Sequence, residues 1–466
     1  MATLLRNGEI ITASDRYVAD IKIDGEKITQ IGLGLIAAPG DTEVDCTGRW
    51  IIPGGIDVHT HLDMPFMGTT SSDDFYTGTR AAAAGGTTCI IDFAIPGRNQ
   101  PLKGAYDLWR EKAQNKAVFD YAFHMAVTWF DTADVRSEFK WCVDQGITSF
   151  KTFMAYKGAL GIDDDELFKV LQYGRDHGVL VTVHAENGDI VDNLVARHRG
   201  EGKLSPEWHA KSRPPEVEGE ATHRAITLAR FNGTPLYIVH MTCDDSLSKV
   251  RAARATGQVV YAETCPQYLV FDDSVYTRPD FDGAKWVMSP PIRPKGNQEA
   301  LWAGIREGLI QTVATDHCPF LFKGQKEMGR GDFSKIPNGA PGIQDRMSVM
   351  YHYGVKAGLI DVHQWIDTCC TRPARIFDLY PRKGTIAVGA DADVVIFDPT
   401  VEFTFSAKNS EQRVDYNLYE GMPGSGYCET VYSRGAMLWE KGKWRGKAGQ
   451  GAYLHRNVGS NPVAQR

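Results

Sequence analysis

The chain has 466 residues, of which 42% are hydrophobic and 23% charged, and its formal net charge is −7. A chain of this length exceeds one ordinary hydrophobic core, so we expect a large α/β domain with a smaller companion. Acidic and basic residues are interspersed, which argues against a binding surface for nucleic acid or an anionic membrane. A small-molecule partner is therefore favoured.

The composition also points to a reducing compartment. Arg6, Glu9 and Asp15 fall where a secretory signal needs an apolar run, so we expect no such signal. No apolar run approaches the roughly 18 to 20 residues that cross a bilayer. The nine cysteines include no Cys-x-x-Cys pair, which is typical of a cytoplasmic protein.

Both ends of the chain have the alternation and turn signals of short β-hairpins. The runs are Ile21–Ile23 before Asp24-Gly25, then Ala392–Phe397, Glu429–Ser433 and Ala436–Glu440. Neither end has enough strands for a core of its own, so we expect residues 1–53 and 376–445 to form one small β-sandwich. Residues 446–466 are polar and glycine-rich, which predicts a C-terminal arm or tail.

Residues 54–375 instead alternate short apolar runs with helical periodicity. In Asp163–His177, a capping arrangement begins the predicted helix and Gly178 ends it. The strand-like runs are Gly55–Val58, Thr87–Phe93, Tyr121–Val127, Gly146–Phe150, Val179–Val183, Leu236–Val239, Val259–Glu263 and Thr312–Thr315. These eight strands predict an α/β fold, a (β/α)8 barrel of the TIM type; a doubly wound open sheet is the alternative.

Polar side chains recur where these strands end. They are His59, His61, Lys151, His184, His240 and Asp316. In a parallel barrel the C-terminal ends of all strands meet on one face, so the six groups should converge. His59 and His61 lie two apart in an extended segment and can face the same cation. One histidine at a strand end is more often a structural residue, but the whole set predicts a metal centre.

The number of candidate ligands indicates two metal ions. A catalytic zinc site usually takes three protein ligands and leaves a position for water, so four histidines and an aspartate are too many for one site. Lys151 does not fit this set, because an ammonium has three donors and no acceptor. On the residues alone it would be a surface or ion-paired lysine.

Five segments resemble the dihydropyrimidinase and D-hydantoinase family over nearly the whole chain. They are Gly-Gly-Ile-Asp-Val-His-Thr-His (54–61), Lys-Thr-Phe-Met-Ala-Tyr-Lys (151–157), His-Ala-Glu-Asn (184–187), Glu-Thr-Cys-Pro-Gln-Tyr-Leu (263–269) and Ala-Thr-Asp-His-Cys-Pro (314–319). The resemblance implies hydrolytic opening of cyclic amides such as dihydrouracil, dihydrothymine and 5-substituted hydantoins to N-carbamoyl amino acids.

The resemblance also implies the composition of the metal centre. Lys151 would react with carbon dioxide to form N6-carboxylysine, whose carboxylate-like group bridges two divalent metals. His59, His61 and Asp316 would hold one metal, and His184 and His240 the other. Zinc is the first choice, with manganese, cobalt or nickel as alternatives.

A bridging hydroxide would then attack the ring carbonyl. Asp316 is the candidate to carry the proton to the leaving nitrogen, unless it acts only as a ligand. Tyr156 matches the family tyrosine that stabilises the developing oxyanion. Ser289 and Asn338 match positions that hold the imide or ureide edge of the substrate, although on sequence alone they read equally well as turn residues.

Several apolar residues near the ligands could form a gate for a ring substituent, or could be ordinary core: Leu62, Met64, Phe66, Phe153 and Leu160. We expect His124 and Cys318 to be structural or supporting rather than catalytic.

Three alternatives remain from the sequence. An allantoinase or a dihydroorotase would share the barrel and metals, although a dihydroorotase should need an arginine for the substrate carboxylate. A scaffold protein related to the family would have lost metal ligands, whereas all six positions are filled here. The resemblance further implies a homotetramer, or a homodimer.

Overall fold

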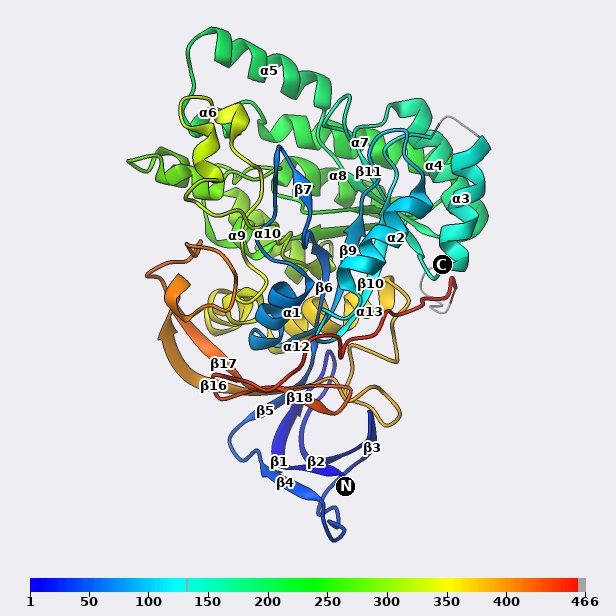
Figure 1. Ribbon diagram of the computed structural model, residues 1–466, viewed down its shortest axis with the longest axis vertical. Coiled ribbons are helices and arrows are strands. Elements are labelled where there is room, and N and C mark those ends of the chain that lie inside the picture. The colour runs from blue at the N-terminus through cyan, green and yellow to red at the C-terminus, as the bar shows by residue number, and fades with distance from the viewer. Residues whose placement is uncertain (131–132, 460–466) are drawn as a thin grey trace.

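An eight-stranded parallel barrel forms the middle of the computed structural model, which describes residues 1–130 and 133–459 (Figure 1). Its strands are β6 (Gly55–Thr60), β9 (Thr87–Ala94), β10 (Asp120–Ala126), β11 (Ser149–Phe153), β12 (Leu180–His184), β13 (Leu236–Ile238), β14 (Val260–Thr264) and β15 (Thr312–Val313). They follow one another in the order β6, β9 to β15, so each strand pairs with its neighbours in the chain.

The barrel closes between its first and last strands. Thr60 forms a parallel bridge with His317, just beyond β15. The Asp57 carboxylate accepts hydrogen bonds from Thr315 N at 3.2 Å and Oγ1 at 2.6 Å. Buried Arg346 spans the same seam, donating to the carbonyls of Ile56 and Val313. The closed barrel is confirmed, and the open-sheet alternative is wrong.

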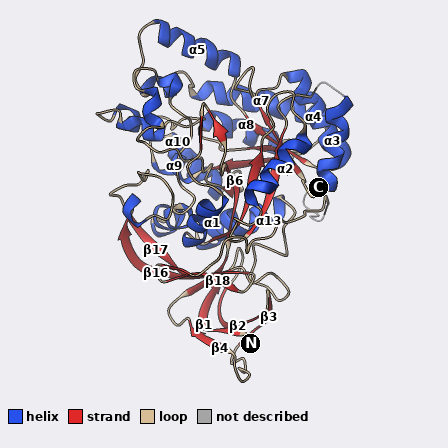
Figure 2. Cartoon of the chain, viewed as in Figure 1, coloured by secondary structure: helices blue, strands red, loops and turns tan. Residues whose placement is uncertain are grey.

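Helices surround this sheet (Figure 2). They are α1 (Phe75–Ala84), α2 (Leu102–Ala113), α3 (Ala133–Asp144), α4 (Asp164–His177), α5 (Gly188–Gly200), α6 (Glu207–Lys211), α7 (Pro215–Asn232), α8 (Asp244–Ala255), α9 (Pro266–Val270), η1 (Asp273–Thr277), η2 (Asp282–Trp286), α10 (Asn297–Arg306), η3 (Lys326–Gly329), η4 (Phe333–Lys335), α11 (Arg346–Val349), η5 (Met350–Lys356), α12 (Val362–Ile366), η6 (Asp367–Thr371) and α13 (Arg372–Ile376). The predicted helix over α4 is confirmed, with a capping box at Asp163 and a left-handed Gly178 at its end.

The predicted strand at Gly146–Phe150 is displaced along the chain. Gly146 has φ 89° and belongs to the turn after α3, where Ile147 N donates to Cys142 O. The first residues of the apolar run belong to this turn, so β11 starts at Ser149. Lys151 consequently lies inside the strand rather than beyond its end.

The two terminal regions combine in a second sheet below the barrel (Figure 1). Its strands are β1 (Thr3–Ile11), β2 (Arg16–Asp24), β3 (Lys27–Gly32), β4 (Thr42–Asp45), β5 (Trp50–Pro53), β16 (Val394–Thr404), β17 (Pro423–Ser433), β18 (Ala436–Glu440) and β19 (Lys443–Trp444), with η7 (Ala407–Asn409) after β16. β5 pairs antiparallel with β16, which joins the two ends of the chain. The predicted shared core is present, because Ile21 and Ile51 pack in one cluster with Val394 and Tyr432. The exact boundaries assigned to the two units stay a prediction.

The C-terminal segment returns to the barrel. Tyr453 forms a parallel bridge with Tyr121, and Leu454 N donates to Tyr121 O at 2.7 Å. The buried Arg456 guanidinium donates to Phe123 O at 2.5 Å and to Ser149 Oγ at 3.2 Å. Within the expected arm, Leu454 and Arg456 are therefore buried against the barrel, and residues 460–466 lie outside the described residues.

Within the described ranges, no helix is both long and apolar enough to cross a membrane. All nine cysteines are buried free thiols.

A buried lysine joins the barrel to the second sheet. Lys383 Nζ lies 2.7 Å from Asp120 at the start of β10, 3.0 Å from Asp391 and 2.8 Å from Asp393, next to β16. These charges raise the pKa of Lys383, although burial alone would lower it. The ammonium is thus the common partner of three buried carboxylates.

Replacing this lysine should destabilise the whole protein. Lys383→Met removes the ion-pair partner of buried Asp393 and one of the cations beside Asp120 and Asp391, and we expect a loss of about 3 to 5 kcal/mol of unfolding free energy. Urea unfolding followed by circular dichroism measures it, with Lys441→Met as control because the Lys441 side chain is 72% exposed. Equal midpoints for the two variants would contradict the prediction.

Candidate metal centre

A cavity of about 50 Å³ lies where the carboxyl ends of the barrel strands meet. Its lining includes all six candidate ligands, His59, His61, Lys151, His184, His240 and Asp316, together with Tyr156, Ser289 and Asn338. The structure therefore brings these residues to one place, although they come from strands and loops far apart in the chain. Their individual roles stay predictions.

One group of ligand atoms gathers around Asp316. His59 Nε2 and His61 Nε2 each lie 3.2 Å from Asp316 Oδ1. The ligand atoms of the three residues all lie within 4.8 Å of one another. Burial lowers the pKa of His59 well below its usual value, and the two imidazoles lower the pKa of Asp316 against the effect of burial. A neutral imidazole and a carboxylate are the forms that bind a metal.

A second group of ligand atoms lies beside the first. His184 Nδ1 is 3.0 Å from His240 Nε2, and the His59 and His240 ring centroids are 5.2 Å apart. Burial lowers the pKa of His184, and it lowers the pKa of His240 well below its usual value. The ring nitrogens facing each other here can thus offer lone pairs to a cation.

Lys151 lines the same cavity as the two groups and has no hydrogen-bonding partner among the described residues. Its side chain is 1% exposed, and Nζ has no acceptor among the residues that the structure describes. The nitrogen lies 5.2 Å from the ring centroids of both Phe93 and Phe153. Burial lowers the pKa of Lys151 to about 7, so a large share of the amine is neutral near pH 7. A neutral amine is the form that can react with carbon dioxide.

A buried glutamate supports the histidines of both groups. Glu263 Oε1 lies 2.6 Å from His59 Nδ1 and also accepts a hydrogen bond from His240 N at 3.0 Å. Tyr237 donates its hydroxyl to the other carboxyl oxygen at 2.8 Å. Because Glu263 holds Nδ1 of His59, the Nε2 lone pair is directed at Asp316.

A second glutamate does the same for His184. Glu186 Oε2 lies 2.8 Å from His184 Nε2, which leaves Nδ1 for the cavity, and it also accepts from Arg213 at 2.6 Å. Burial raises the pKa of Glu263 to about 8. Burial would also raise the pKa of Glu186, but Arg213 and His184 outweigh this effect and lower the pKa to about 2. The arginine is what distinguishes the two carboxyl groups.

Three residues around the cavity have unusual backbone conformations. Tyr156, His240 and Asp316 have φ angles of 61°, 36° and 53°, in the left-handed region that side chains other than glycine rarely adopt. The Tyr156 carbonyl accepts hydrogen bonds from the backbone of Ala159, Leu160 and Gly161, which fixes this turn. Strain of this kind is typical of functional sites.

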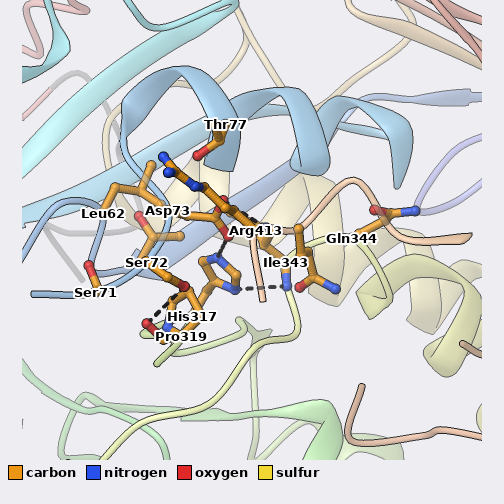
Figure 3. A network of polar contacts seen from close by, with 12 residues as sticks. Leu62, Ser71, Ser72, Asp73, Thr77, His317, Pro319, Ile343, Gln344 and Arg413 are labelled. Atoms are coloured by element: carbon orange, nitrogen blue, oxygen red, sulfur yellow. Dashed lines mark hydrogen bonds and ion pairs between the residues drawn. The ribbon is translucent and has the colours of Figure 1, made fainter. Parts of the chain in front are cut away.

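The backbone next to Asp316 is held by a histidine. Figure 3 shows the His317 ring between Asp73 and the backbone of Ile343. Nδ1 accepts from Gly342 N and Ile343 N, so Nε2 carries the proton and donates to Asp73 Oδ2 at 3.1 Å. His317 O accepts from His61 N at 2.9 Å. This residue thereby ties the Asp316 segment to that of His61.

Tyr156, Ser289 and Asn338 form a polar wall of the cavity. Asn338 Nδ2 donates to Ser289 Oγ at 3.0 Å. Burial raises the pKa of Tyr156, although the Arg213 charge and hydrogen bonds with Ser289 and Asn338 oppose it. The tyrosine therefore keeps its proton at neutral pH and can donate a hydrogen bond.

Four of the five expected gate residues line the cavity: Met64, Phe66, Phe153 and Leu160. Phe66 belongs to a small hairpin, β7 (Pro65–Phe66) and β8 (Thr69–Thr70), and packs edge-on against Tyr156. Leu62 lies in the turn after β6 and is fully buried against Gly78 of α1 instead. Its place does not suit a gate.

Two residues ranked lower from the sequence also lie close to the site. Cys318 contributes to the cavity lining. His124 lies inside the barrel, where it bonds Ser149 Oγ and Val58 O and stacks on Phe93.

The residues fit a pair of divalent cations. Within each of the two sets, facing ligand atoms lie 3.0 to 3.2 Å apart. Lys151 lines the same cavity and is buried without a hydrogen-bonding partner among the residues that the structure describes. Carboxylation would give that side chain two acceptor oxygens in place of an amine. Imidazole and carboxylate donors suit zinc, manganese, cobalt and nickel alike.

Sequence reasoning missed the supporting residues Glu186, Glu263 and Arg213. Glu263 is the last residue of a predicted strand, near the position where the ligands follow theirs. Glu186 comes two residues after His184. Both signals were available. Arg213 lies in a loop before α7, and nothing in its sequence surroundings indicates the contact with Glu186.

Removing the Glu263 charge should weaken metal binding. In Glu263→Gln a neutral amide oxygen takes the place of the carboxyl oxygen that bonds both His59 Nδ1 and His240 N, so the contacts that orient His59 weaken. We therefore expect metal affinity to fall about 10- to 100-fold. Metal content after dialysis against a graded chelator series measures this, with the exposed Glu299→Gln as control. Unchanged affinity in the folded variant would show that Glu263 does not support the ligands.

Comparison with known proteins agrees with this site. The model of the amidohydrolase family matches residues 50–435. D-hydantoinase of Geobacillus stearothermophilus is 50% identical over 98% of this chain and 97% of its own, and dihydropyrimidinase of Rattus norvegicus is 40% identical over 97% and 88%. The crystal structure of dihydropyrimidinase from Brevibacillus agri NCHU1002 has a TM-score of 0.97 at 50% identity, covering 98% of this chain and 99% of that one. The chain belongs to the amidohydrolase family, among its D-hydantoinases and dihydropyrimidinases.

Proposed function

We propose that this protein is a cyclic amidohydrolase that opens dihydropyrimidine and hydantoin rings to N-carbamoyl amino acids. The family membership and the near full-length similarity to D-hydantoinases and dihydropyrimidinases support this activity. The observation that carries it is the buried Lys151 amine, which has no partner among the described residues and lines one cavity with two groups of metal-binding atoms.

The residues of the cavity divide the chemistry among them. Two divalent cations, when bound, would lower the pKa of water towards neutrality and polarise the ring carbonyl. We assign them to His59, His61 and Asp316 on one side, His184 and His240 on the other, with carboxylated Lys151 between. Zinc is our first choice of metal.

Asp316 is the proposed proton carrier. Its pKa is lowered by His59 and His61, so it is a carboxylate that can take a proton from the attacking water. As the bond between the carbonyl carbon and the ring nitrogen breaks, the same proton goes to that nitrogen. Tyr156 donates a hydrogen bond to the developing oxyanion, and Ser289 and Asn338 hold the imide or ureide edge of the ring.

The remaining wall of the cavity favours neutral ring substituents. Among the described residues that line it, Met64, Phe66, Ile95, Phe153 and Leu160 are apolar, and none is an arginine. A dihydroorotate carboxylate would find no guanidinium there. The complete ligand set argues against the scaffold alternative.

A substrate panel tests the assignment. We expect turnover of dihydrouracil and 5-substituted hydantoins by metal-loaded protein, measured by the loss of ring absorbance. Allantoin and dihydroorotate serve as the comparison. Activity on only these last two would contradict the proposal.

Lys151→Ala should abolish activity, because the bridge between the two groups of ligands is lost. We expect a small carboxylic acid such as propionate to restore part of the rate by taking the place of the missing carbamate. Metal analysis should show reduced occupancy in the same variant. Lys157→Ala is the control, since Lys157 lies in the same segment with a side chain 39% exposed. Full rate and metal content in Lys151→Ala would exclude the bridging role.

We also propose a homotetramer in the cytoplasm. The oligomer rests on the resemblance to the family, and sedimentation equilibrium measures it. The compartment rests on nine cysteines that are all free.

A further inference from the structure

A buried lysine outside the metal centre binds only backbone carbonyls. Lys326, at the start of η3, is 0% exposed. Its Nζ donates to Val287 O at 2.7 Å, Pro337 O at 2.8 Å and Gly339 O at 2.6 Å. These three bonds use all the donors of an ammonium group.

The three carbonyls belong to the two segments that carry the polar wall of the cavity. Val287 comes two residues before Ser289, and Pro337 and Gly339 flank Asn338 on either side. Ser289, Asn338 and Gly339 all line the cavity. The segments also meet directly, because Gly339 N donates to Val287 O at 3.0 Å. Lys326 is thus a common anchor for two segments about fifty residues apart in the chain.

Binding these carbonyls also sets the direction of the neighbouring N–H groups. In a trans peptide the C=O and the N–H point in opposite directions. With Pro337 O bound to Lys326, Asn338 N–H points away from the lysine, and with Val287 O bound, Met288 N–H does too. The ammonium therefore orients the peptide groups next to both Ser289 and Asn338.

Burying the charge of Lys326 carries a desolvation cost. Among the described residues the hydrogen bonds of Lys326 Nζ go to carbonyl oxygens and not to a carboxylate, and burial lowers its pKa to about 7. An apolar side chain of similar length would avoid the desolvation cost of the ammonium, but it would take this donor away from the three carbonyls. The lysine therefore holds the two segments together at the cost of its own burial.

We propose that Lys326 is a positioning residue for substrate binding. By holding Val287 O, Pro337 O and Gly339 O together, it sets the spacing of the Ser289 and Asn338 segments to that of the planar imide or ureide edge of the ring. This inference rests on the proposed function and assigns the lysine no contact with substrate or metal.

Lys326→Met tests it, because methionine keeps most of the side-chain length and loses every donor. Displacement of a substrate-holding group by about 1 Å can cost on the order of 100-fold, so we expect KM for the best ring substrate to rise 10- to 100-fold. The value of kcat should change little, since the lost contacts hold the ring in the ground state and the transition state alike. Metal content should equal that of the unmodified protein.

Lys335→Met is the matched control, because this lysine lies in the same loop with a side chain 66% exposed. It should leave KM and kcat unchanged. Lys326→Gln is the second variant: its amide can still donate to one or two of the carbonyls, and we expect a KM between the other two.

Two results would overturn the positioning role. One is a folded, metal-loaded Lys326→Met with the KM of the unmodified protein. The other is loss of folding or of metal in both Lys326 variants, which would make the lysine a stability element. Failure of the proposed function is a separate result, because the unmodified protein would then open none of the rings in the panel.

Discussion

Burial of the ligand side chains at the mouth of the barrel is the constraint on which the site depends. An isolated ion is costly in such surroundings, so basic groups there tend to lose their protons. His59, His184, His240 and Lys151 all have lowered pKa values for this reason. Their neutral nitrogens carry the lone pairs that metal binding and reaction with carbon dioxide require. The same surroundings would be unfavourable for a lysine that stayed unmodified.

Burial affects the pKa values of the two supporting carboxyl groups differently. Glu186 keeps its charge because Arg213 lies against it. Glu263 has no such arginine, and burial raises its pKa to about 8, yet its oxygens still fix the His59 ring and the His240 backbone. Carboxyl groups thus orient both halves of the site, one beside an arginine and the other without one among its hydrogen-bonding partners in the described residues. A divalent cation nearby would favour the ionised form of Glu263.

Much of this arrangement could be predicted from the sequence. Short apolar runs identified the eight barrel strands, and the polar residues after them identified the cavity, because strand ends in a barrel have only one place to converge. The start of β11 was predicted three residues too early. Gly146 belongs to a turn with a positive φ, and that turn depends on three-dimensional packing. Lys326 was missed for a related reason. Its partners are backbone carbonyls, which leave no mark in the residue types, and the same holds for Arg456 beneath the barrel.

The contacts of Arg456 have a consequence for how the barrel folds. Ser149 Oγ and Phe123 O accept hydrogen bonds from Arg456, which lies 307 and 333 residues further along the chain. Contacts between residues so distant in sequence require closure of a long loop, which costs more chain entropy than pairing neighbouring strands. We therefore expect the floor of the barrel to close late in folding, after strands adjacent in the chain have paired.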